Sequence, residues 1–539
     1  MGRPFSNAFF AGEPRASAFL SGDFRDPATR EAAARAAASR RAHPAVVEAL
    51  TAQQRRLPSS AARDANLAAL ARGDTAVVVT GQQVGLFLGP LYSFYKAASA
   101  VATARALEAA SGARCIPLFW LQTEDHDHAE IASCRVLGAD GAPVALALAP
   151  ETAAEARVSI AHRRLGTEVT VALEALDEAL AGAPHAAAVV ASLRAAYEPG
   201  RSYAEAFARV LATIFADEGL LILDPRDARI AAAASPIYAR ALDDAEAIEA
   251  RLRTRGRELA NAGFDEQIPV RDGCALLFFH DGGPAAPRHR LKRAGARWEL
   301  SGAGRFLDDA RVRVALADDP LRGSTSALLR PLVQDALLPT AAYVGGPAEV
   351  SYFAQLDPLY DVFALPHPLV VPRARFRVID APTRRRLGQL GLTAAEAEGP
   401  RAELAARISA AHPTDEPHPA ELRARVAREV APAADQIARA LIAADPGAAR
   451  IAARARRSID RAFERMIARA ERALVTRDVP ALARLDKLQR ALAPDGVPQE
   501  RVYAWPSLAA RLGIAPFTRM VLEHLARAPF TTTVQELTP

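Results

Sequence analysis

Residues 80–130 read TGQQVGLFLGPLYSFYKAASAVATARALEAASGARCIPLFWLQTEDHDHAE, and this stretch decides the fold. An apolar run at 76–79 ends in a polar turn rich in glycine, and a helical pattern then opens near Gly89. A second apolar run, at 116–121, ends in the charged cluster at 124–128. Two buried strands that flank a helix form a βαβ unit, and such units bind ligands at the carboxyl ends of their strands. The sequence therefore predicts an α/β enzyme.

The wider pattern extends this unit into a Rossmann-like core with a parallel sheet and inserted connecting segments. Further buried strands are predicted at 219–225, at 341–347, where the run ends in Gly-Gly-Pro, and at 369–371. The other expected elements are short strands at 133–137, 143–148, 275–279, 289–292 and 297–300, and helices within 27–50, 59–71, 169–216 and 227–262. Strands that alternate with helices in this way are typical of parallel sheets.

The region past residue 380 has a different pattern, typical of a coiled coil. Apolar residues at Leu422, Val426, Val430, Ala433, Ile437 and Leu441 step by four, four, three, four and four. Asp445-Pro446-Gly447 breaks the helix, and a similar apolar stripe then resumes from Ile451 to Ala473. Narrow apolar seams around a tight turn predict an antiparallel coiled-coil hairpin. Such an arm fits a role in pairing subunits better than a role as a basic stalk for nucleic acid.

These patterns divide the chain into three parts. The catalytic core is predicted at 1–378, with insertions at about 140–215 and 262–305. The helical arm is predicted at 379–492, and a C-terminal segment at 493–539 is expected to pack back on the core.

Composition excludes several classes of protein. The chain has 539 residues, half of them hydrophobic, so it can bury a large core. No run of eighteen apolar residues occurs, and the first residues lack the apolar centre of a secretory signal, so a cytoplasmic protein without a membrane span is expected. A net charge of +5 with interspersed acids and bases does not favour a nucleic-acid partner. Cys115, Cys134 and Cys274 lack CxxC spacing and suit buried thiols of a reducing compartment.

Lysine is rare in this chain, which makes its positions informative. The basic residues are nearly all arginine, and the only lysines are Lys96, Lys292 and Lys487. Lys96 lies near the end of the first strand, where a point charge or a titratable amine could act on a ligand. Lys292 and Lys487 are expected to be surface charges.

The loop after the first strand is the first candidate site. Gln82, Gln83, Gly85 and Gly89 could present amides and backbone N–H groups to a phosphate or carboxylate at a helix N-terminus. The loop is neither a Walker A motif nor GxGxxG. Alternatively, the glycines shape an ordinary strand-to-helix turn.

The charged cluster is the second candidate site. In an extended segment Asp125 and Asp127 would share one side, and Glu124, His126 and His128 the other. General acid and base catalysis at His126 is one interpretation, and metal ligation by His and Asp is another. No second cluster has ligand spacing, so no metal site is predicted. The alternative is a hydrogen-bonded polar turn that closes the strand.

The third candidate site follows the apolar run at 327–333. Arg330 and Gln334 share a face if this segment is helical, and Arg330 could bind a carboxylate or a phosphate through both of its terminal nitrogens. Alternatively, Arg330 is a buried residue paired with Asp335. The same site would include four residues further along the chain, Tyr343, Gly345, Gly346 and Glu349.

Together these stretches resemble a known family. The strings at 80–92, 95–96, 119–120, 124–127, 329–335, 338–340, 342–347 and 352–356 are similar to those of the BshC family, the cysteine-adding enzymes of bacillithiol biosynthesis. Weaker similarity is found at 219–225, 371–373 and 499–502, whereas His128 and Arg375 depart from the family's pattern. The matching strings span most of the chain in order.

The resemblance implies a fold, an activity and partners. It implies a Rossmann-like core like that of class I nucleotidyltransferases, and a coiled-coil arm that pairs two copies into a homodimer. The implied reaction joins cysteine to glucosaminyl-malate, the last step in making bacillithiol. ATP or ADP is the implied nucleotide.

The residues suggest roles for this reaction. Gln82, Gln83, Lys96 and the backbone at Gly89 are expected to hold an anionic group, with Tyr95 and Trp120 beside them. His126 or Asp127 is the expected base, and Arg330 is expected to pair with a carboxylate. Two other classes remain open: an amino-acid-activating ligase or nucleotidyltransferase with another substrate, and a non-catalytic scaffold built around the arm.

Overall fold

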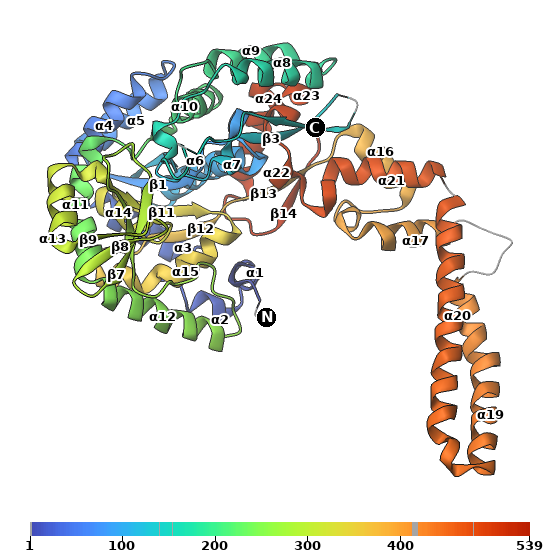
Figure 1. The fold of residues 1–539 in the computed structure, drawn as a ribbon. Coiled ribbons are helices and arrows are strands. Elements are labelled where there is room, and N and C mark those ends of the chain that lie inside the picture. Colours follow the sequence, from blue (N-terminus) through green and yellow to red (C-terminus); the bar gives the residue numbers. More distant parts are fainter. Residues whose placement is uncertain (1–2, 140, 154, 412–418, 478) are drawn as a thin grey trace. The chain divides into compact units, whose positions relative to one another are not determined.

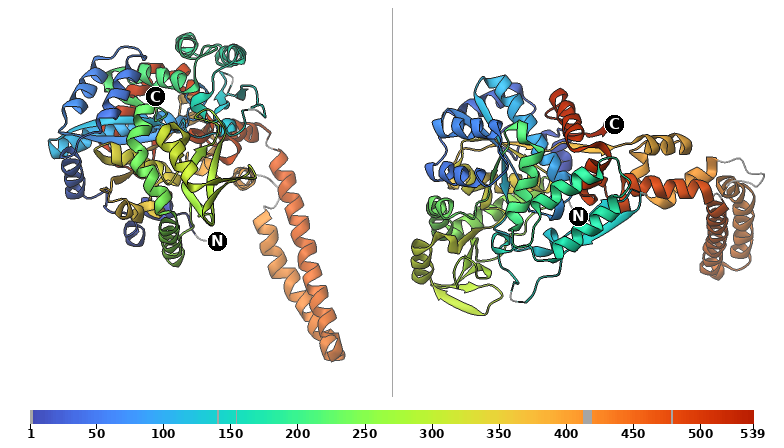
Figure 2. Two further views of the ribbon diagram at one scale, coloured as in Figure 1. Left: turned by 60° about the vertical axis from the view of Figure 1, so that its left-hand side comes forward. Right: turned by 90° about the horizontal axis from the view of Figure 1, so that it is seen from above.

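The computed structural model describes residues 3–139, 141–153, 155–411, 419–477 and 479–539. The chain forms two compact units. The first consists of Met1–Arg377 and Glu500–Leu537, and the second of Val378–Gln499 with the last two residues. Figures 1 and 2 show the sheets and helices of the first unit and the long helices of the second.

The core of the first unit is a parallel sheet of five strands. Its order is β12-β11-β1-β2-β5, and every pairing is parallel. The strands are β1 (Thr75–Gln82), β2 (Arg114–Leu121), β5 (Leu221–Leu223), β11 (Thr340–Gly345) and β12 (Leu369–Pro372). The predicted Rossmann-like fold is confirmed. The strand order reverses between β1 and β11, and ligands of such sheets bind at the carboxyl ends beside this reversal.

Helices enclose the sheet, which explains why its strands are apolar on both faces. α6 (Leu91–Ser111) packs on β1 and β2, and α3 (Pro27–Ala38) packs on β1 and β11. The helical pattern at 27–50 is interrupted, because Pro44 begins a new helix, α4 (Pro44–Gln54), with His43 as its N-cap. The other helices of this core are α5 (Ala61–Arg72), α14 (Arg330–Leu337) and α15 (Pro347–Val362).

Two insertions interrupt the core. The predicted hairpin is present as β3 (Ser133–Leu137) and β4 (Pro143–Ala147), followed by α8 (Glu168–Leu180), α9 (Ala186–Ala196) and α10 (Tyr203–Ile214). The second insertion contains an antiparallel sheet of order β10-β6-β7-β8-β9. Its strands are β6 (Cys274–His280), β7 (Arg288–Ala294), β8 (Arg297–Leu300), β9 (Arg305–Asp308) and β10 (Gly323–Thr325), with α11 (Ala228–Asp243) and α12 (Ala245–Asn261) before them and α13 (Asp309–Asp318) between the last two. This sheet continues past the predicted limit of 305.

The C-terminal segment returns to the first unit. α24 (Ile514–Arg527) packs on α6, where Phe517 stacks on Phe94 at 4.9 Å between ring centroids. The other elements of this segment are α22 (Gln499–Val502), α23 (Pro506–Leu512) and β14 (Val534–Leu537), which pairs with β13 (Arg375–Val378). Three short helices complete this unit: α1 (Phe5–Phe10), α2 (Pro14–Ser17) and α7 (His128–Ile131).

The second unit is helical and contains the predicted coiled-coil hairpin. α19 (Ala431–Ala444) and α20 (Ala449–Arg477) lie side by side, joined by a tight turn in which the Asp445 carboxylate accepts a hydrogen bond from the Gly447 N–H. The unit also contains α16 (Ala381–Leu390), α17 (Arg401–Ala411), α18 (Pro419–Arg425), a π-helical turn (Val426–Val430) and α21 (Val479–Leu492).

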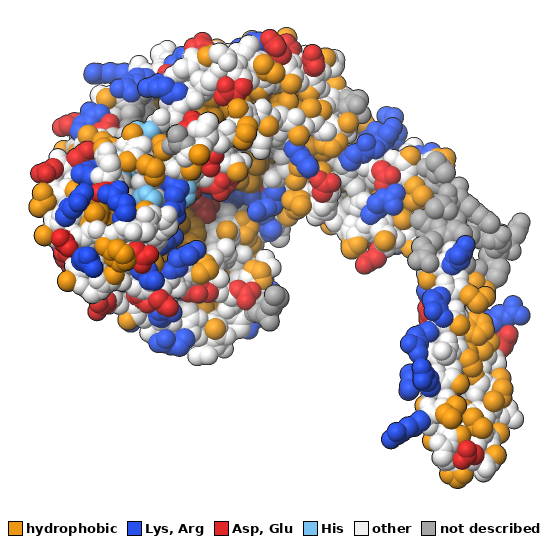
Figure 3. Space-filling model, in the orientation of Figure 1, with side chains coloured by type: hydrophobic (Ala, Val, Ile, Leu, Met, Phe, Trp, Pro, Cys, Tyr) orange, Lys and Arg blue, Asp and Glu red, His pale blue; other side chains and the backbone are white. Residues whose placement is uncertain are grey.

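The predicted seam of this hairpin is wrong in part. Ile437, Ile451 and Met466 were expected between the helices, but they are 71%, 66% and 67% exposed. Residues next to the predicted ones are buried instead, such as Ala452 beside Ile451 and Ile467 beside Met466. Figure 3 shows the apolar side chains along the surface of α19 and α20. None of the helices described is long and apolar enough to cross a membrane.

Candidate active site

A cavity of about 500 Å³ opens at the carboxyl ends of the core strands, within the first unit. Its walls include the end of β1, the first turns of α6, the turn after β2, the segment that leads into α14, the start of α15, and the inserted sheet with α12, together with Arg373 and Arg501. A cavity of this volume matches the usual size of a small-molecule site. It lies where the topology of a doubly wound sheet places its ligands.

The structure brings half of the predicted site residues to this cavity. Those that line it are Gln82, Lys96, Trp120, Glu124, Asp125, His126, Arg330, Gly346 and Glu349. The other predicted residues lie outside this lining in the described chain: Gln83, Gly85, Gly89, Tyr95, Asp127, Gln334, Asp335, Tyr343 and Gly345. Gln83, Gln334 and Tyr343 each form a hydrogen bond with a residue of the lining.

The glycine-rich loop is a packed turn. The Gly85 N–H donates to the Gln83 carbonyl at 3.0 Å, and the Gly89 N–H donates to the Leu86 carbonyl at 2.8 Å. The Tyr197 hydroxyl accepts from the Leu88 N–H and donates to the Gly85 carbonyl, both at 3.2 Å. These backbone groups are already used inside the protein, so the N–H groups of Gly85 and Gly89 are not free to bind an anion in this structure.

Tyr95 also points away from the cavity. Its ring packs against Phe376 at 4.9 Å between centroids, and the side chain is fully buried. Tyr95 is therefore a core residue, since neighbouring positions on a helix face different directions. Lys96, the next residue on α6, does reach the cavity.

Lys96 forms a buried ion pair with Glu349. The Lys96 ammonium also donates to the Gly81 carbonyl and to Gln82 Oε1, the latter at 3.0 Å. An ammonium has three N–H groups, and here all three have acceptors. Burial lowers the pKa of Lys96 to about 8, although Glu349 opposes that shift. Lys96 was expected to contact an anionic ligand, whereas in the structure its anionic partner is the Glu349 carboxylate.

Glu349 is held from several sides. Its carboxylate accepts hydrogen bonds from the Gly346 N–H at 2.7 Å and from the Tyr343 hydroxyl, besides the ion pair with Lys96. Burial raises the pKa of Glu349, but Lys96 and these hydrogen bonds outweigh burial and keep that pKa below its usual value. The pair joins α6, the helix that follows β1, to the start of α15 across the strand reversal.

Arg330 is a buried cation without an acidic partner. It donates to Gln334 Oε1 and to the Tyr352 hydroxyl, each at 2.9 Å, and it is 5% exposed. No carboxylate of the described residues lies within 4.0 Å of its guanidinium. The predicted alternative, a pair with Asp335, is wrong, because Asp335 accepts hydrogen bonds from Gln334 and from Tyr360. A buried charge without a partner is costly unless a ligand completes it.

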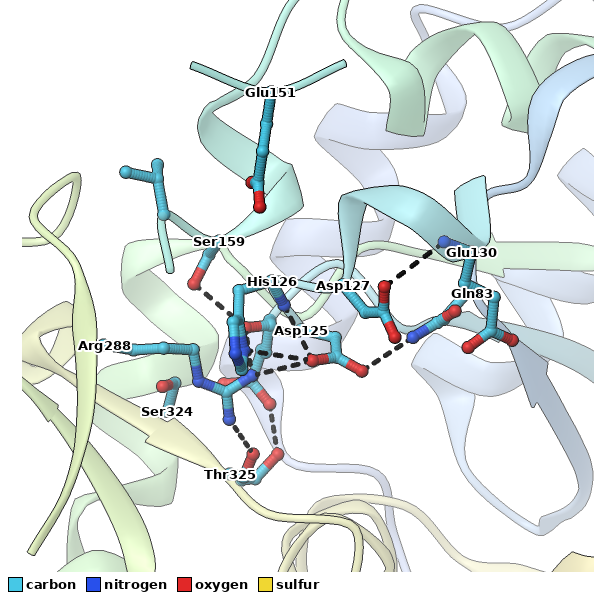
Figure 4. Close-up of polar contacts among 12 residues, drawn as sticks. Gln83, Asp125, His126, Asp127, Glu130, Glu151, Ser159, Arg288, Ser324 and Thr325 are labelled. Atoms are coloured by element: carbon cyan, nitrogen blue, oxygen red, sulfur yellow. Dashed lines mark hydrogen bonds and ion pairs between the residues drawn. The ribbon is translucent and has the colours of Figure 1, made fainter. Parts of the chain in front are cut away.

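The charged cluster forms a turn, which corrects the predicted alternation along an extended segment (Figure 4). Glu124 is buried and accepts a hydrogen bond from the Thr325 hydroxyl of β10. Asp127 is the N-cap of α7 and accepts from the Glu130 N–H at 3.2 Å. His128 is also buried and lies 3.3 Å from the Tyr203 hydroxyl. Asp127 and His128 thus support the turn instead of lining the cavity.

Asp125 and His126 lie side by side on the cavity wall. His126 Nδ1 lies 3.3 Å from Asp125 Oδ1, and the imidazole is about one-third exposed. Asp125 also accepts from the His126 N–H at 2.7 Å and from the Gln83 amide at 2.6 Å. Burial raises the pKa of Asp125, but these hydrogen bonds and the nearby Arg288 hold that pKa well below its usual range. The approach at Nδ1 is a close contact of opposite charges when the imidazole is protonated, and it does not have the geometry of a hydrogen bond.

Sequence reasoning missed most of the arginines in the cavity. The basic side chains that line it are Lys96, Arg271, Arg288, Arg290, Arg330, Arg373 and Arg501, and the acidic ones are Glu124, Asp125, Glu249 and Glu349. Arg373 pairs with Glu500 at 2.7 Å. Arg271, Arg290, Arg330 and Arg501 have no carboxylate within 4.0 Å in the part of the chain that the structure describes. Arg288 and Arg290 lie on a short insertion strand, where arginines are commonly surface charges, and only the weaker similarity at 371–373 and 499–502 pointed toward Arg373 and Arg501.

Unpaired polar atoms also gather at this place. Trp120 Nε1, His126 Nδ1 and Arg288 Nε belong to lining residues, and Gln83 Oε1 lies on the residue that contacts Asp125; all four atoms are buried and have no hydrogen-bond partner among the described residues. Such atoms are rare in native interiors, and they concentrate where a ligand or an ordered water completes the site.

The doubly wound core and its polar cavity define an enzyme that acts on small molecules. Comparison with known families narrows this class. The N-terminal Rossmann-like domain of bacillithiol biosynthesis BshC matches residues 2–374, and the C-terminal coiled-coil domain of BshC matches residues 376–530. The chain therefore belongs to the BshC family, the ligases of bacillithiol biosynthesis.

Relatives from three bacteria illustrate this membership. The chain is 34% identical over 380 residues to a protein of Salinibacter ruber, covering 70% of this chain and 68% of the relative. It is 32% identical over 455 residues to one of Solibacter usitatus, covering 83% and 82%. It is also 32% identical over 487 residues to one of Koribacter versatilis, covering 87% and 85%. Each relative is named as a proposed cysteine ligase, BshC.

The buried ion pair gives a test of the site's framework. Replacing Lys96 by Met leaves the Glu349 carboxylate buried without its cation, and we expect the free energy of unfolding to fall by about 3–5 kcal/mol. Adding Glu349→Gln removes that charge and should restore most of the loss. Urea unfolding followed by tryptophan fluorescence measures both.

Lys292→Met is the matched control, because Lys292 is exposed on β7. Its effect should stay within about 0.5 kcal/mol. If Lys96→Met lowers the free energy of unfolding no more than this control does, the ion pair does not stabilise the framework of the site.

Proposed function

We propose that this chain joins L-cysteine to glucosaminyl-malate and so forms bacillithiol in the last step of its biosynthesis. The observation that carries the proposal is Arg330, a buried cation on the cavity wall that lacks an acidic partner within the described chain. Both substrates carry carboxylates, which suit this position. The names of the relatives, which refer to cysteine, favour this substrate over another amino acid.

The electrostatics of the cavity support anionic substrates. Arg271, Arg290 and Arg501 accompany Arg330 without acidic partners in the described chain, so the lining carries an excess of positive charge. The N-terminus of α15 also faces the cavity through Gly346, Pro347 and Ala348. Helix N-termini attract anions, because the backbone dipoles align toward them. A dicarboxylate such as the malate group fits this environment.

Amide formation requires activation of the cysteine carboxylate. At neutral pH a carboxylate does not react with an amine, so an acyl phosphate or an acyl adenylate must form first. ATP supplies this group in our proposal and releases ADP or pyrophosphate, and the attacking amine then displaces phosphate or AMP, respectively. The site at the strand reversal of a doubly wound sheet is suited to a nucleotide as well as to the substrates.

His126 acts as the base in this scheme. The attacking amine of the sugar must lose a proton as it forms the amide bond, and His126 is the one imidazole in the cavity lining, as far as the chain is described. Asp125 orients the imidazole through the contact at Nδ1. This arrangement leaves Nε2 to accept the proton.

The reaction itself is the first test of this function. Purified protein should form a new thiol product from cysteine and glucosaminyl-malate only when ATP is present. His126→Gln should lower kcat by about 10²–10⁴, because the base is lost while the hydrogen-bonding shape is kept. Product is quantified by thiol labelling and mass spectrometry.

Controls separate this function from its rivals. His185→Gln changes a histidine outside the cavity lining and should leave turnover intact. ATP-dependent turnover with another amino acid but not with cysteine would indicate an amino-acid-activating ligase of different specificity. A wild-type protein that forms no product with any amino acid would support the scaffold alternative.

Arg330 provides a second test. Arg330→Met should raise KM for glucosaminyl-malate or for cysteine by about tenfold to a hundredfold, because a charge-assisted contact is lost. Arg330→Lys keeps the charge, so its KM should lie between those of the wild type and Arg330→Met. Arg297→Met, on an exposed part of β8, is the control for losing an arginine. Unchanged KM values in both Arg330 variants would show that no substrate carboxylate binds there.

We further propose that a second copy of the chain covers the apolar stripe on the arm. Ile437, Leu441, Ile451 and Met466 are 71%, 40%, 66% and 67% exposed on α19 and α20. An exposed apolar stripe of this kind is unusual unless a partner covers it. The same stripe on a second hairpin is the complementary surface that a symmetric dimer requires.

This proposal predicts the oligomeric state. Ile437→Glu combined with Ile451→Glu should convert a dimer to a monomer in light scattering, because each change places a charge in the apolar contact. Gln436→Glu combined with Ala453→Glu adds the same charges at exposed neighbouring positions and should leave the dimer intact. A wild-type monomer would contradict the proposal.

A further inference from the structure

We infer that Arg288 is a positioning residue, which holds the turn carrying Asp125 and His126 in its active geometry. Its kinetic consequence rests on the proposed ligase function, whereas its structural consequence does not. Arg288 lies on β7 of the inserted sheet, far in sequence from the turn that it contacts.

The contacts of Arg288 join three segments. Nη1 donates to the Glu124 carbonyl at 2.7 Å and lies 3.4 Å from Asp125 Oδ1. Nη2 donates to the carbonyl of Thr325, at the end of β10, at 2.8 Å. One guanidinium therefore links β7, β10 and the turn after β2, as Figure 4 shows.

The orientation of the guanidinium is fixed from its face as well. Its centre lies 3.9 Å from the centroid of the Phe278 ring, and the side chain is 4% exposed. The hydroxyl of Thr325 donates to the Glu124 carboxylate, which adds a second link between β10 and the turn. The planar guanidinium group of arginine has donors in several fixed directions and can make these contacts together, whereas a lysine ammonium cannot.

The charge of Arg288 acts on the same turn. Burial lowers the pKa of Arg288 to about 10, so it remains a cation at neutral pH. It faces the Asp125 carboxylate together with His126 and the Gln83 amide. Asp125 thus stays ionised and keeps its contact with the imidazole.

The same contacts distinguish positioning from substrate binding. Two of the three guanidinium nitrogens are used on backbone carbonyls of the protein, and only Nε is without a partner among the described residues. Arg330 differs, since its hydrogen-bond partners are the side chains of Gln334 and Tyr352 and no carboxylate of the described chain lies within 4.0 Å of it. Loss of Arg288 should therefore change the rate constant, and loss of Arg330 the Michaelis constant.

Kinetics of two variants test this distinction. Arg288→Lys and Arg288→Ala should lower kcat by about tenfold to a hundredfold, because the base is displaced from its position. KM should stay within about twofold. Added guanidinium should recover part of the rate of Arg288→Ala, which a loss through general instability would not allow. A higher KM with unchanged kcat, or no effect on either, would overturn the inference.

A spectroscopic readout tests the inference without any turnover. In protein labelled at histidine with ¹³C, the His126 ring signal is assigned by its absence in His126→Gln. Arg288→Lys and Arg288→Ala should shift or broaden that signal, and guanidinium should restore it in the alanine variant. Arg293→Ala is the control, because Arg293 lies on the same strand but pairs with Asp309 at 3.5 Å.

The two readouts separate the two proposals. A wild-type protein without ligase activity rejects the proposed function, but the His126 signal still tests Arg288. A His126 signal that is the same in wild type and in both Arg288 variants, with all three proteins folded by thermal melting, overturns the role of Arg288.

Discussion

Lys96 and Glu349 form an ion pair inside the protein, at the point where the order of the core strands reverses. Lys96 comes from the helix after β1, and Glu349 from the first turn of the helix after β11. The pair therefore ties together the two βα connections that frame the cavity. Because both groups are buried, neither can be lost alone without leaving a charge uncompensated. The positions of Gln82, Gly346 and Tyr343 all depend on this pair through direct hydrogen bonds.

The inserted segments complete what the core sheet begins. A doubly wound sheet supplies a cleft at its strand ends, but here the second wall comes from β6, β7 and α12. Arg288 and Thr325 fasten that wall to the turn after β2. His126 and Asp125, the base and the orienting carboxylate that we propose, thus belong to the core, while Arg288 and Thr325, which contact their turn, belong to the insertion. This division explains why the cavity collects residues from 82 to 501 of one chain.

The sequence predicted those parts of the structure that depend on local pattern. Continuous apolar runs identified β1 and β2, and clustered polar residues marked the ends where Gln82 and His126 lie. The errors arose where tertiary contacts decide the outcome. Tyr197, at the C-terminal end of α9, donates a hydrogen bond to the Gly85 carbonyl and so helps to pack this loop. No pattern in the sequence near Gly85 predicts that contact. Arg288 lies just before the strand predicted at 289–292 and was not singled out, because contacts with Phe278 and Thr325 cannot be read from a periodicity. The sequence predicted the hairpin of the arm, but not which of its apolar residues face outward, because a periodicity does not show which side of a helix contacts its neighbour.

The balance of charge in the cavity links the fold to its chemistry. Lys96, Arg288 and Arg373 each have an acidic neighbour, Glu349, Asp125 and Glu500, so these cations are used in holding the protein together. Arg271, Arg290, Arg330 and Arg501 are not neutralised by any carboxylate within 4.0 Å in the described residues. Positive charge that the protein does not balance itself attracts anionic ligands and orients them. The proposed reaction brings the malate carboxylates, the cysteine carboxylate and the phosphates of ATP together, and their mutual repulsion would oppose the encounter in water. In the proposed reaction, the arginines without acidic partners offset that repulsion. They would therefore allow several anionic groups to bind at the same time, besides increasing the affinity for each one.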